Sequence, residues 1–173
     1  GILLTESGGF TIVAEGGATD TYDIVLTSQP ASDVTITLAA YPQVTEDQAG
    51  SVVFTNDNRN VPVPATIKAV DASVMEGTHS GLTTTTAASA DAAYNAYPMP
   101  NVLASIADND NAGVTITEPG GSTDVTEGGV TDSVDVVLDS QPTADVVITL
   151  DGSPQLTTGA ASITFTAGDW NTP

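Results

Sequence analysis

The chain has no cysteine and only two basic residues, Arg59 and Lys68, among its 173 residues. The lack of cysteine excludes a disulfide framework and a thiolate metal site. Acidic residues number 22, so the formal net charge is -20, and such a surface repels nucleic-acid phosphates and anionic lipid headgroups. No apolar run approaches the ~18 residues that a membrane span needs. We therefore expect no nucleic-acid partner and no membrane insertion, and cations are the favoured partners.

The residue patterns that mark common enzymes are missing as well. The single histidine, His79, lies in a polar stretch away from any Gly-x-Ser-x-Gly motif, and we interpret it as a plain surface residue. Neither Gly16-Gly17 nor Gly128-Gly129 is followed by a lysine, which is typical of turns rather than of a phosphate-binding loop. The few aromatic residues argue against the sugar stacking of a glycosidase. We predict that the protein is not an enzyme.

An internal repeat dominates the sequence and is the first positive feature to interpret. At an offset of 112 residues, Gly1–Gly9, Ala14–Asp20 and Leu26–Pro30 recur as Gly113–Gly121, Thr126–Asp132 and Leu138–Pro142. The offset becomes 111 further on, where Phe54 recurs as Phe165. The second copy stops at Pro173, which matches Pro62. We predict a complete domain over residues 1–110 and the first half of a second domain over residues 111–173.

The second copy lacks a counterpart of residues 63–110. A sandwich without its last three strands has open edges and an uncovered core, so we do not expect residues 113–173 to fold stably alone. Two explanations stay open. Either the chain is cut from a longer array of repeats, or another chain supplies the missing strands by strand complementation.

Short alternating runs bounded by Gly, Pro, Asp and Ser indicate the fold class. The expected strands of the first copy span residues 2–6 with 10–14, 21–27, 33–38, 51–55, 63–70, 81–87 and 101–107. The break at Gly8-Gly9 lets the first strand change sheets. Seven strands in this length predict an all-β, immunoglobulin-like seven-stranded β-sandwich, as a tandem repeat with an incomplete second copy.

The same alternation predicts which side chains face the core. In the first copy they are Tyr22, Ile24, Leu26, Val34, Ile36, Leu38, Val52, Phe54, Ala65, Ile67, Ala69, Val102, Ala104 and Ile106. In the second copy they are Val134, Val136, Leu138, Val146, Ile148, Leu150, Ile163 and Phe165.

Acidic residues of the first copy are expected to gather at one end of the sandwich. If every strand crosses the sandwich once, the loops after alternate strands share an end. The loops at that end carry Glu15, Asp20, Glu46, Asp47, Asp71, Glu76, Asp108 and Asp110. The other end receives the loops at residues 28–30, 56–60 and 88–100. We interpret Asp20 and Asp47 as turn formers.

Gathered carboxylates repel one another unless a cation neutralises them. Ca²⁺ takes about six to eight oxygen ligands from carboxylates and carbonyls. The candidate ligands are the carboxylates of Glu15, Asp71, Glu76, Asp108 and Asp110 and the carbonyls of Ala72 and Asn109. Mg²⁺ keeps several waters and needs fewer carboxylates, so it ranks second. A transition metal is disfavoured, because the chain has one histidine and no thiol.

These segments resemble a Calx-beta domain. The likeness lies in Glu15-Gly16, in the segment from Ala69 through Asp71 and Glu76, and in the closing residues 106–110. The family is named for the calcium-binding loops of sodium/calcium exchangers and also occurs in bacterial surface proteins. The resemblance covers the first copy and the opening half of the second. It implies Ca²⁺ bound at one end of the sandwich, and one ion rather than several.

The resemblance also implies a location and a role. We expect an extracellular or cell-surface protein in which this chain is a calcium-rigidified structural repeat, a stalk or an adhesin spacer. Its partners are then neighbouring repeats or like chains. The alternative is a self-assembling subunit of an extracellular filament, in which a neighbouring chain or repeat completes the half domain. A module that recognises sugar or protein is a weaker option, because no site for it is identifiable.

Overall fold

The computed structural model describes residues 1–48 and 50–173, and in this part of the chain the protein is all-β, with strands and one short 3-10 turn. The chain divides into two compact units. The first holds residues 1–72 and 77–109, and the second holds residues 73–76 and 110–173. The domains expected at residues 1–110 and 111–173 stay a prediction, and residues 73–76 fall in the second unit. Among the described residues, no helix has the length and apolar character needed to cross a membrane.

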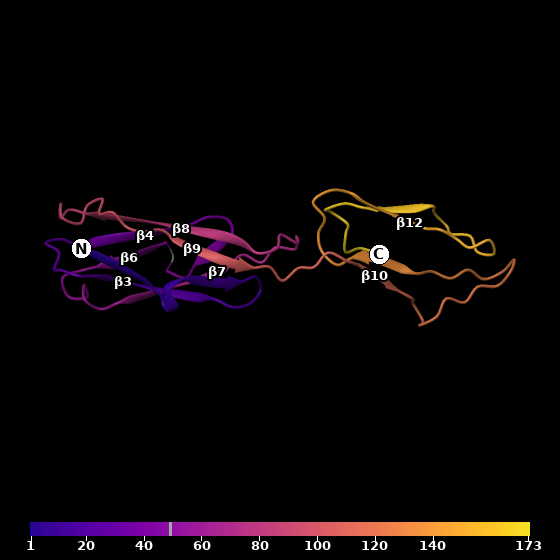
Figure 1. The fold of residues 1–173 in the computed structure, drawn as a ribbon, viewed down its shortest axis with the longest axis horizontal. Helices are drawn as coiled ribbons and strands as arrows, with labels where there is room; N and C mark the ends of the chain where they lie inside the picture. The colour runs from indigo at the N-terminus through magenta and orange to yellow at the C-terminus, as the bar shows by residue number, and fades with distance from the viewer. Residues whose placement is uncertain (49) are drawn as a thin grey trace. The chain divides into compact units, whose positions relative to one another are not determined.

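The first unit is a β-sandwich of two sheets (Figure 1). One sheet has the order β1 (Ile2–Glu6), β3 (Asp20–Leu26), β7 (Val63–Ala69) and β5 (Val44–Glu46). The other has the order β2 (Thr11–Ala14), β9 (Val102–Ala107), β8 (His79–Ser89), β4 (Val34–Ala40) and β6 (Ser51–Phe54). The neighbours are antiparallel except β2 and β9, which are parallel. The predicted all-β, immunoglobulin-like sandwich is confirmed.

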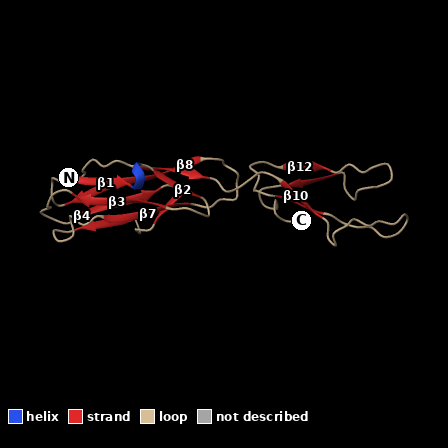
Figure 2. Cartoon of the chain, turned by 60° about the horizontal axis from the view of Figure 1, so that its bottom comes forward, coloured by secondary structure: helices blue, strands red, loops and turns tan. Residues whose placement is uncertain are grey.

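The first strand changes sheets at its glycine break, as the sequence predicts. The 3-10 turn η1 (Ser7–Gly9) separates β1 from β2, which belong to different sheets (Figure 2, blue). Gly8 and Gly9 have φ angles of 67° and 85°. These angles lie in the left-handed region, which residues with a Cβ atom rarely adopt, so the change of sheet depends on glycine. The parallel pairing of β2 with β9 follows from this change.

The core of the first unit consists of the side chains that period-two alternation selects. Every predicted inward residue of the first copy is buried except Ala69, which is partly buried. Tyr94 adds a buried aromatic ring that the alternation does not predict, because it lies in the loop before β9. Buried apolar area on both inner faces is what holds two sheets together.

The strand count differs from the expected seven. The described residues of the first unit form nine strands, because η1 divides the first strand, expected at residues 2–6 with 10–14, and because β5 forms in a segment expected to be a loop. β5 pairs with β7 over three residues, from Val44 opposite Ala69 to Glu46 opposite Ile67. A three-residue strand is too short for alternation to reveal it in the sequence.

The loops at the end away from the acidic residues meet as expected. The amide of Ala31 donates to Asp91 at 2.8 Å, and the amide of Leu26 donates to the carbonyl of Arg59 at 2.9 Å. The Tyr94 hydroxyl donates to the carbonyl of Ser28 at 2.5 Å. Loops that are distant in sequence are therefore tied together by hydrogen bonds.

The second unit repeats the strand pairing of the first. It contains β10 (Val114–Thr117), β11 (Asp135–Leu138), β12 (Val146–Thr149) and β13 (Ser162–Phe165). β10 pairs with β11 in the register of β1 with β3, and β12 pairs with β13 in the register of β4 with β6, at the offsets of the sequence repeat. The described residues of this unit form two separate two-stranded sheets.

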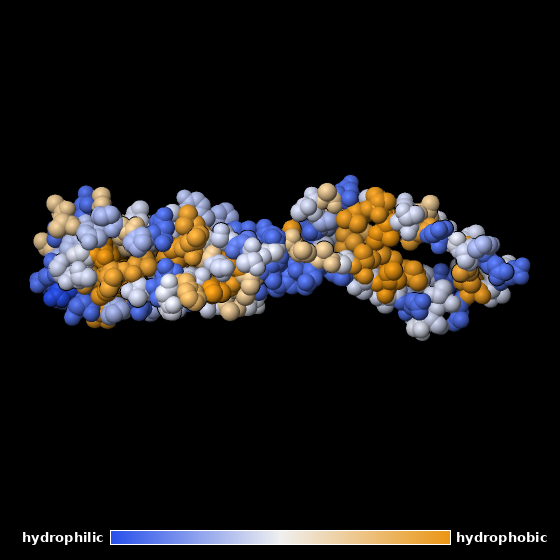
Figure 3. Space-filling view, in the orientation of Figure 1, coloured by the Kyte–Doolittle hydropathy of each residue, from blue (hydrophilic) through white to orange (hydrophobic). Residues whose placement is uncertain are grey.

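The side chains of the second unit are much less buried than their counterparts in the first unit, although the strands pair in the same register. Only Val136, Leu138 and Phe165 form a buried apolar cluster, with Trp170 and three strand residues packed against it. Val134, predicted to face inward, is 46% exposed, whereas its counterpart Tyr22 is 1% exposed. Apolar side chains accordingly gather on the surface of this unit (Figure 3, orange).

Candidate metal centre

Three segments of the first unit meet at the end where β2 and β9 finish. β2 runs parallel to β9 with Ala14 opposite Ala107, so the residues after both strands emerge side by side. The Glu15 amide donates to the Ala107 carbonyl at 3.0 Å and extends this pairing. β8 begins at the same end, because His79 lies opposite Ile106. The parallel pair thus brings Glu15 next to the acidic residues that follow β9.

Hydrogen bonds tie the loops at this end together. The Gly77 amide donates to Asp108 Oδ2 at 2.5 Å, which links the start of β8 to the end of β9. Asn109 Nδ2 donates to Asp71 Oδ1 at 3.1 Å, which links the segment after β9 to the segment after β7. Gly16 packs against the same pair, with a φ of 58° and with an added Cβ atom only 2.9 Å from Asn109 Nδ2. No larger residue fits there without displacing a side chain.

Two overlapping groups of side chains at this end have the geometry to hold a metal ion. One is Glu15, Asp108 and Asp110, and the other is Glu15, Glu76 and His79. In each group the ligand atoms lie within 4.8 Å of one another. Glu15, His79 and Asp108 belong to the first unit, whereas Glu76 and Asp110 belong to the second. Glu15 belongs to both groups.

Glu15 is the most buried carboxylate of the two groups. It is 2% exposed as a residue, and its side chain is fully buried. Burying a carboxylate is costly unless positive charge or hydrogen bonds compensate it. The two basic residues of the chain belong to neither group: Arg59 lies in the loop between β6 and β7, and Lys68 is exposed in β7. Its burial makes Glu15 the central residue of the two groups.

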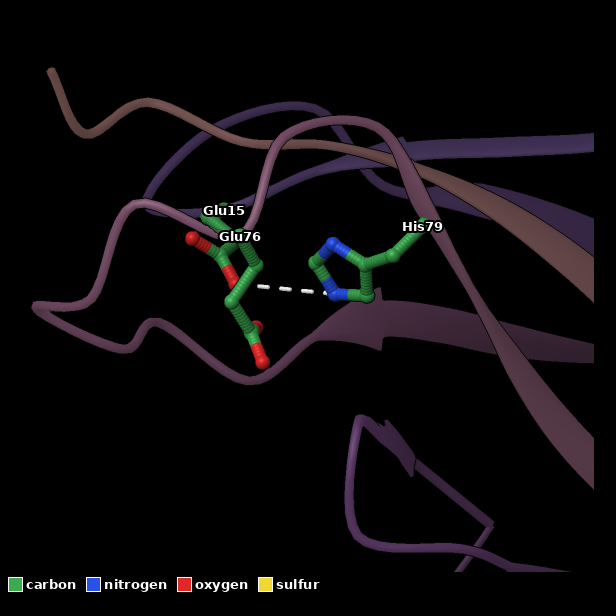
Figure 4. A group of neighbouring side chains, drawn as sticks. All are labelled: Glu15, Glu76 and His79. Atoms are coloured by element: carbon green, nitrogen blue, oxygen red, sulfur yellow. Dashed lines mark ion pairs between the residues drawn. The ribbon is translucent and has the colours of Figure 1, made fainter. Parts of the chain in front are cut away.

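His79 is part of this centre, which corrects the interpretation of it as a plain surface residue. Its side chain is 17% exposed, and Nε2 lies 3.8 Å from Glu15 Oε1. Figure 4 shows the imidazole turned toward Glu15, with Glu76 beside them. The expected strand began at residue 81, two residues too late, and so left His79 in a loop. The assumption that every strand crosses the sandwich once could have placed His79 near the acidic residues, since the start of this strand lies at the acidic end.

The other predicted ligands, Asp71, Ala72 and Asn109, lie outside the two groups of three. Asp71 is exposed and belongs to neither group of three; its carboxylate accepts a hydrogen bond from Asn109. Asn109 is exposed as well, and its side-chain amide faces Asp71. Ala72 is partly buried in the same loop. The use of the Ala72 and Asn109 carbonyls as ligands stays a prediction.

Two other acidic residues assigned to this end, Glu46 and Asp47, are used in structural hydrogen bonds. Asp47 accepts from the Thr66 amide at 2.7 Å, and Glu46 accepts from the Thr83 hydroxyl at 2.6 Å. Burial raises the pKa of the Glu46 carboxyl above its usual value. Neither of these residues belongs to the ligand groups.

Asp20 holds the turn at which the first strand changes sheets. Its carboxylate accepts from the Ser7 hydroxyl at 2.5 Å and from the amides of Ile12 and Thr21 at 2.9 and 2.7 Å. These bonds, the Ser7 bond above all, hold the pKa of Asp20 below its usual value. The interpretation of Asp20 as a turn former is therefore confirmed, and that of Asp47 agrees with its bond to Thr66.

Comparisons with known proteins add little to this description. No family model matches the chain, and no curated protein matches it. Among solved structures, the periplasmic chaperone SfaE is similar with a TM-score of 0.45 and 9% sequence identity, over 79% of this chain and 82% of that one. No function is transferred from a likeness of this size.

Proposed function

We propose that residues 1–110 form a calcium-binding structural repeat of an extracellular or cell-surface protein. The observation that supports it most is the fully buried carboxylate of Glu15, shared by two groups of ligand side chains at one end of the sandwich. A buried carboxyl group at one end of the sandwich, in a chain of net charge -20, fits a cation-binding module. The resemblance of the same residues to a Calx-beta domain points in the same direction.

Calcium suits the group Glu15, Asp108 and Asp110 better than other cations do. All three ligands are carboxylates, and Ca²⁺ prefers oxygen ligands in flexible geometry. Carbonyls of Ala72 and Asn109, the Asp71 carboxylate and water would complete the coordination. Mg²⁺ ranks second, because it demands near-octahedral geometry and loses its waters reluctantly.

Calcium at this position would stiffen the end of the sandwich. The ion would neutralise the repulsion among carboxylates that come from the segments after β2, β7 and β9. It would also fix the residues after β9, which lead out of the first unit. A spacer in a stalk or an adhesin requires this kind of stiffness where one repeat follows another, and its partners are neighbouring repeats or like chains.

Thermal unfolding in Ca²⁺ and in EDTA tests the proposal. A ligand present at 100 times its dissociation constant stabilises the folded state by about 2.7 kcal/mol. For a unit of this size we expect Tm to rise by about 10 °C when Ca²⁺ replaces EDTA. Mg²⁺ at the same concentration should raise Tm less. An equal Tm in EDTA and in Ca²⁺ would falsify the proposal.

A filament subunit is the second candidate, and the second unit favours it. Its strands β11 and β12 pair on one side only within the described residues, and apolar side chains such as Val134 stay exposed. In the first unit the matching strands β3 and β4 have a second neighbour, β7 and β8. A neighbouring chain that supplied these strands would complete the half domain.

Light scattering of the purified chain over a range of concentrations separates the two candidates. A filament subunit polymerises as concentration rises, whereas a spacer stays monomeric. Monomers at every concentration would remove the filament candidate and leave the calcium module untouched.

A further inference from the structure

Two strands of the second unit are shorter than their counterparts, at the places where a later strand pairs in the first unit. In β3, residues 20–21 pair with β7 alone, and their counterparts at 132–133 lie outside β11. In β4, residues 38–40 pair with β8 alone, and their counterparts at 150–152 lie outside β12. The difference in strand length therefore marks where a further strand would pair.

One edge of β11 has no strand beside it in the described part of the second unit, where the β10–β11 sheet has two strands. At Leu138 this edge is occupied, because the amide donates to the Trp170 carbonyl at 2.8 Å. The Leu26 amide makes the same bond to Arg59 in the first unit. The rest of the edge, over residues 132–136, matches the part of β3 that pairs with β7. An open edge presents N–H and C=O groups with the spacing that another strand requires.

An apolar hollow lies next to this edge. It has a volume of about 440 Å³, and it is lined by residues of the second unit, among them Val134, Val136 and Ile163. Val134 is one of the apolar side chains that stay on the surface of this unit (Figure 3, orange). Its counterpart Tyr22 is buried and lies opposite Ala65 of β7. A strand at the same place in the second unit would remove apolar surface from water, which favours its binding.

We infer that residues 132–136 bind a β7-type segment of another copy of this repeat as an added antiparallel strand. In the first unit residues 63–67 pair with β3, with Ala65 opposite Tyr22. At the repeat offset the incoming segment places its Ala65 position opposite Val134. The apolar side chains that alternate along β7 then face the hollow. The inference rests on the second candidate function in taking the strand from outside the unit, and it adds the edge, the register and the side chains.

A titration of the ¹⁵N-labelled full chain with an unlabelled peptide of residues 61–71 tests the inference. We expect saturable amide shifts over residues 132–136 and slower amide hydrogen exchange there, because the added strand supplies hydrogen-bond partners. A peptide with Ala65→Asp should bind at least about tenfold more weakly, because its charge would enter the apolar hollow. Thr66→Asp is the matched control, since it adds the same charge on the opposite face and should leave binding nearly unchanged.

Two variants of the full chain complete the test. Val134→Asp should abolish peptide binding, whereas Val130→Asp adds the same charge at another exposed valine and should not. Both should keep the main melting transition, which shows that they fold.

Each outcome decides the inference separately from the filament candidate. Shifts only outside residues 132–136, or equal binding of the two charged peptides, would overturn the inference. Chains that polymerise without binding the peptide would overturn it and leave the filament candidate intact. Chains that bind the peptide in the stated register and stay monomeric would support it and remove that candidate.

Discussion

The two units share a strand register but not a core. Val136 and Leu138 pair with β10 as Ile24 and Leu26 pair with β1, yet Val134 is exposed where Tyr22 is buried. The pairing of β1 with β3, or of β10 with β11, depends only on the two strands that pair. Because both copies of the repeat contain these strands, both show the same pairing. Burial depends on strands that arrive later in the sequence, and in the first unit these are β7, β8 and β9. The comparison separates what local sequence specifies from what the complete sandwich adds.

The equivalent acidic residues Glu15 and Glu127 also differ in burial. Glu15 is buried among ligand side chains, whereas its counterpart Glu127 is exposed. Both follow the same local sequence and precede a glycine with positive φ, Gly16 or Gly128. The difference is that β9 and the loop after β7 meet Glu15. The proposed metal centre therefore requires the whole sandwich. Each of the following paired substitutions tests the contrast between the two copies.

The largest contrast is expected between Phe54→Ala and Phe165→Ala. Phe54 is fully buried in the large core, so its removal should destabilise the first unit by about 3–5 kcal/mol. Phe165 belongs to the small cluster of the second unit, so its removal should leave the main melting transition unchanged. Calorimetry measures both variants. Equal shifts would mean that the two units unfold as one cooperative body.

The second contrast is between Glu15→Gln and Glu127→Gln, measured by Ca²⁺ titration calorimetry. The amide of glutamine keeps the shape of the side chain and removes the charge, so the first variant should lose Ca²⁺ binding. Glu127→Gln should bind Ca²⁺ as the parent does. Loss of binding in both variants would contradict a site built around Glu15.

Gly16→Ala and Gly128→Ala form the third contrast. Both glycines have positive φ, so alanine carries a similar backbone cost of about 1–2 kcal/mol at either position. Only at Gly16 would the Cβ atom also meet Asn109 and Asp71. Gly16→Ala should therefore weaken Ca²⁺ affinity, and Gly128→Ala should not. Unchanged affinity in Gly16→Ala would place Asp71 and Asn109 outside the calcium site.

The smallest contrast concerns Asp20 and Asp132. Asp132 accepts from the amides of Asp124 and Ser133, the counterparts of Ile12 and Thr21, so the same turn recurs in the second unit. Asp20→Ala should lower the stability of the first unit by about 1 kcal/mol at pH 7. Asp132→Ala should leave the main transition unchanged.

The pH dependence of this contrast follows from the lowered pKa of Asp20. The folded state favours the ionised carboxylate, so its contribution is complete above the unfolded pKa of about 3.9 and is lost as pH falls through the lower folded pKa. Melting from pH 7 to pH 2 should show the parent and Asp20→Ala converging at the acid end. A constant difference in Tm across this range would contradict the assignment.

Sequence patterns predict most of the fold because they act locally. Alternation selects the core residues of the first unit, from Tyr22 to Ile106, and the glycine pair marks the change of sheet. The three-residue strand β5 escapes prediction, since it is too short to show a period and depends on β7 as its partner. Tyr94 escapes for a similar reason, because it enters the core from a loop.

The centre is predicted in part. Counting strand traverses places Glu15, Glu76, Asp108 and Asp110 at one end, and the structure brings them together in the two ligand groups. Counting strands does not predict which carboxylates accept hydrogen bonds from the protein, as Glu46 does from Thr83. It misses His79 because a strand start two residues earlier is invisible to composition. The start of a strand and the partners of its side chains depend on the register of strand pairing, which is set by the neighbouring strands.

Backbone amide chemical shifts of the full chain during a Ca²⁺ titration test the central claim most directly. We predict saturable changes in residues 15–17, 71–72, 76–79 and 107–110, and no comparable change in residues 127–132. Changes of equal size around Glu127, or no saturable change around Glu15, would contradict a metal centre built by the complete sandwich.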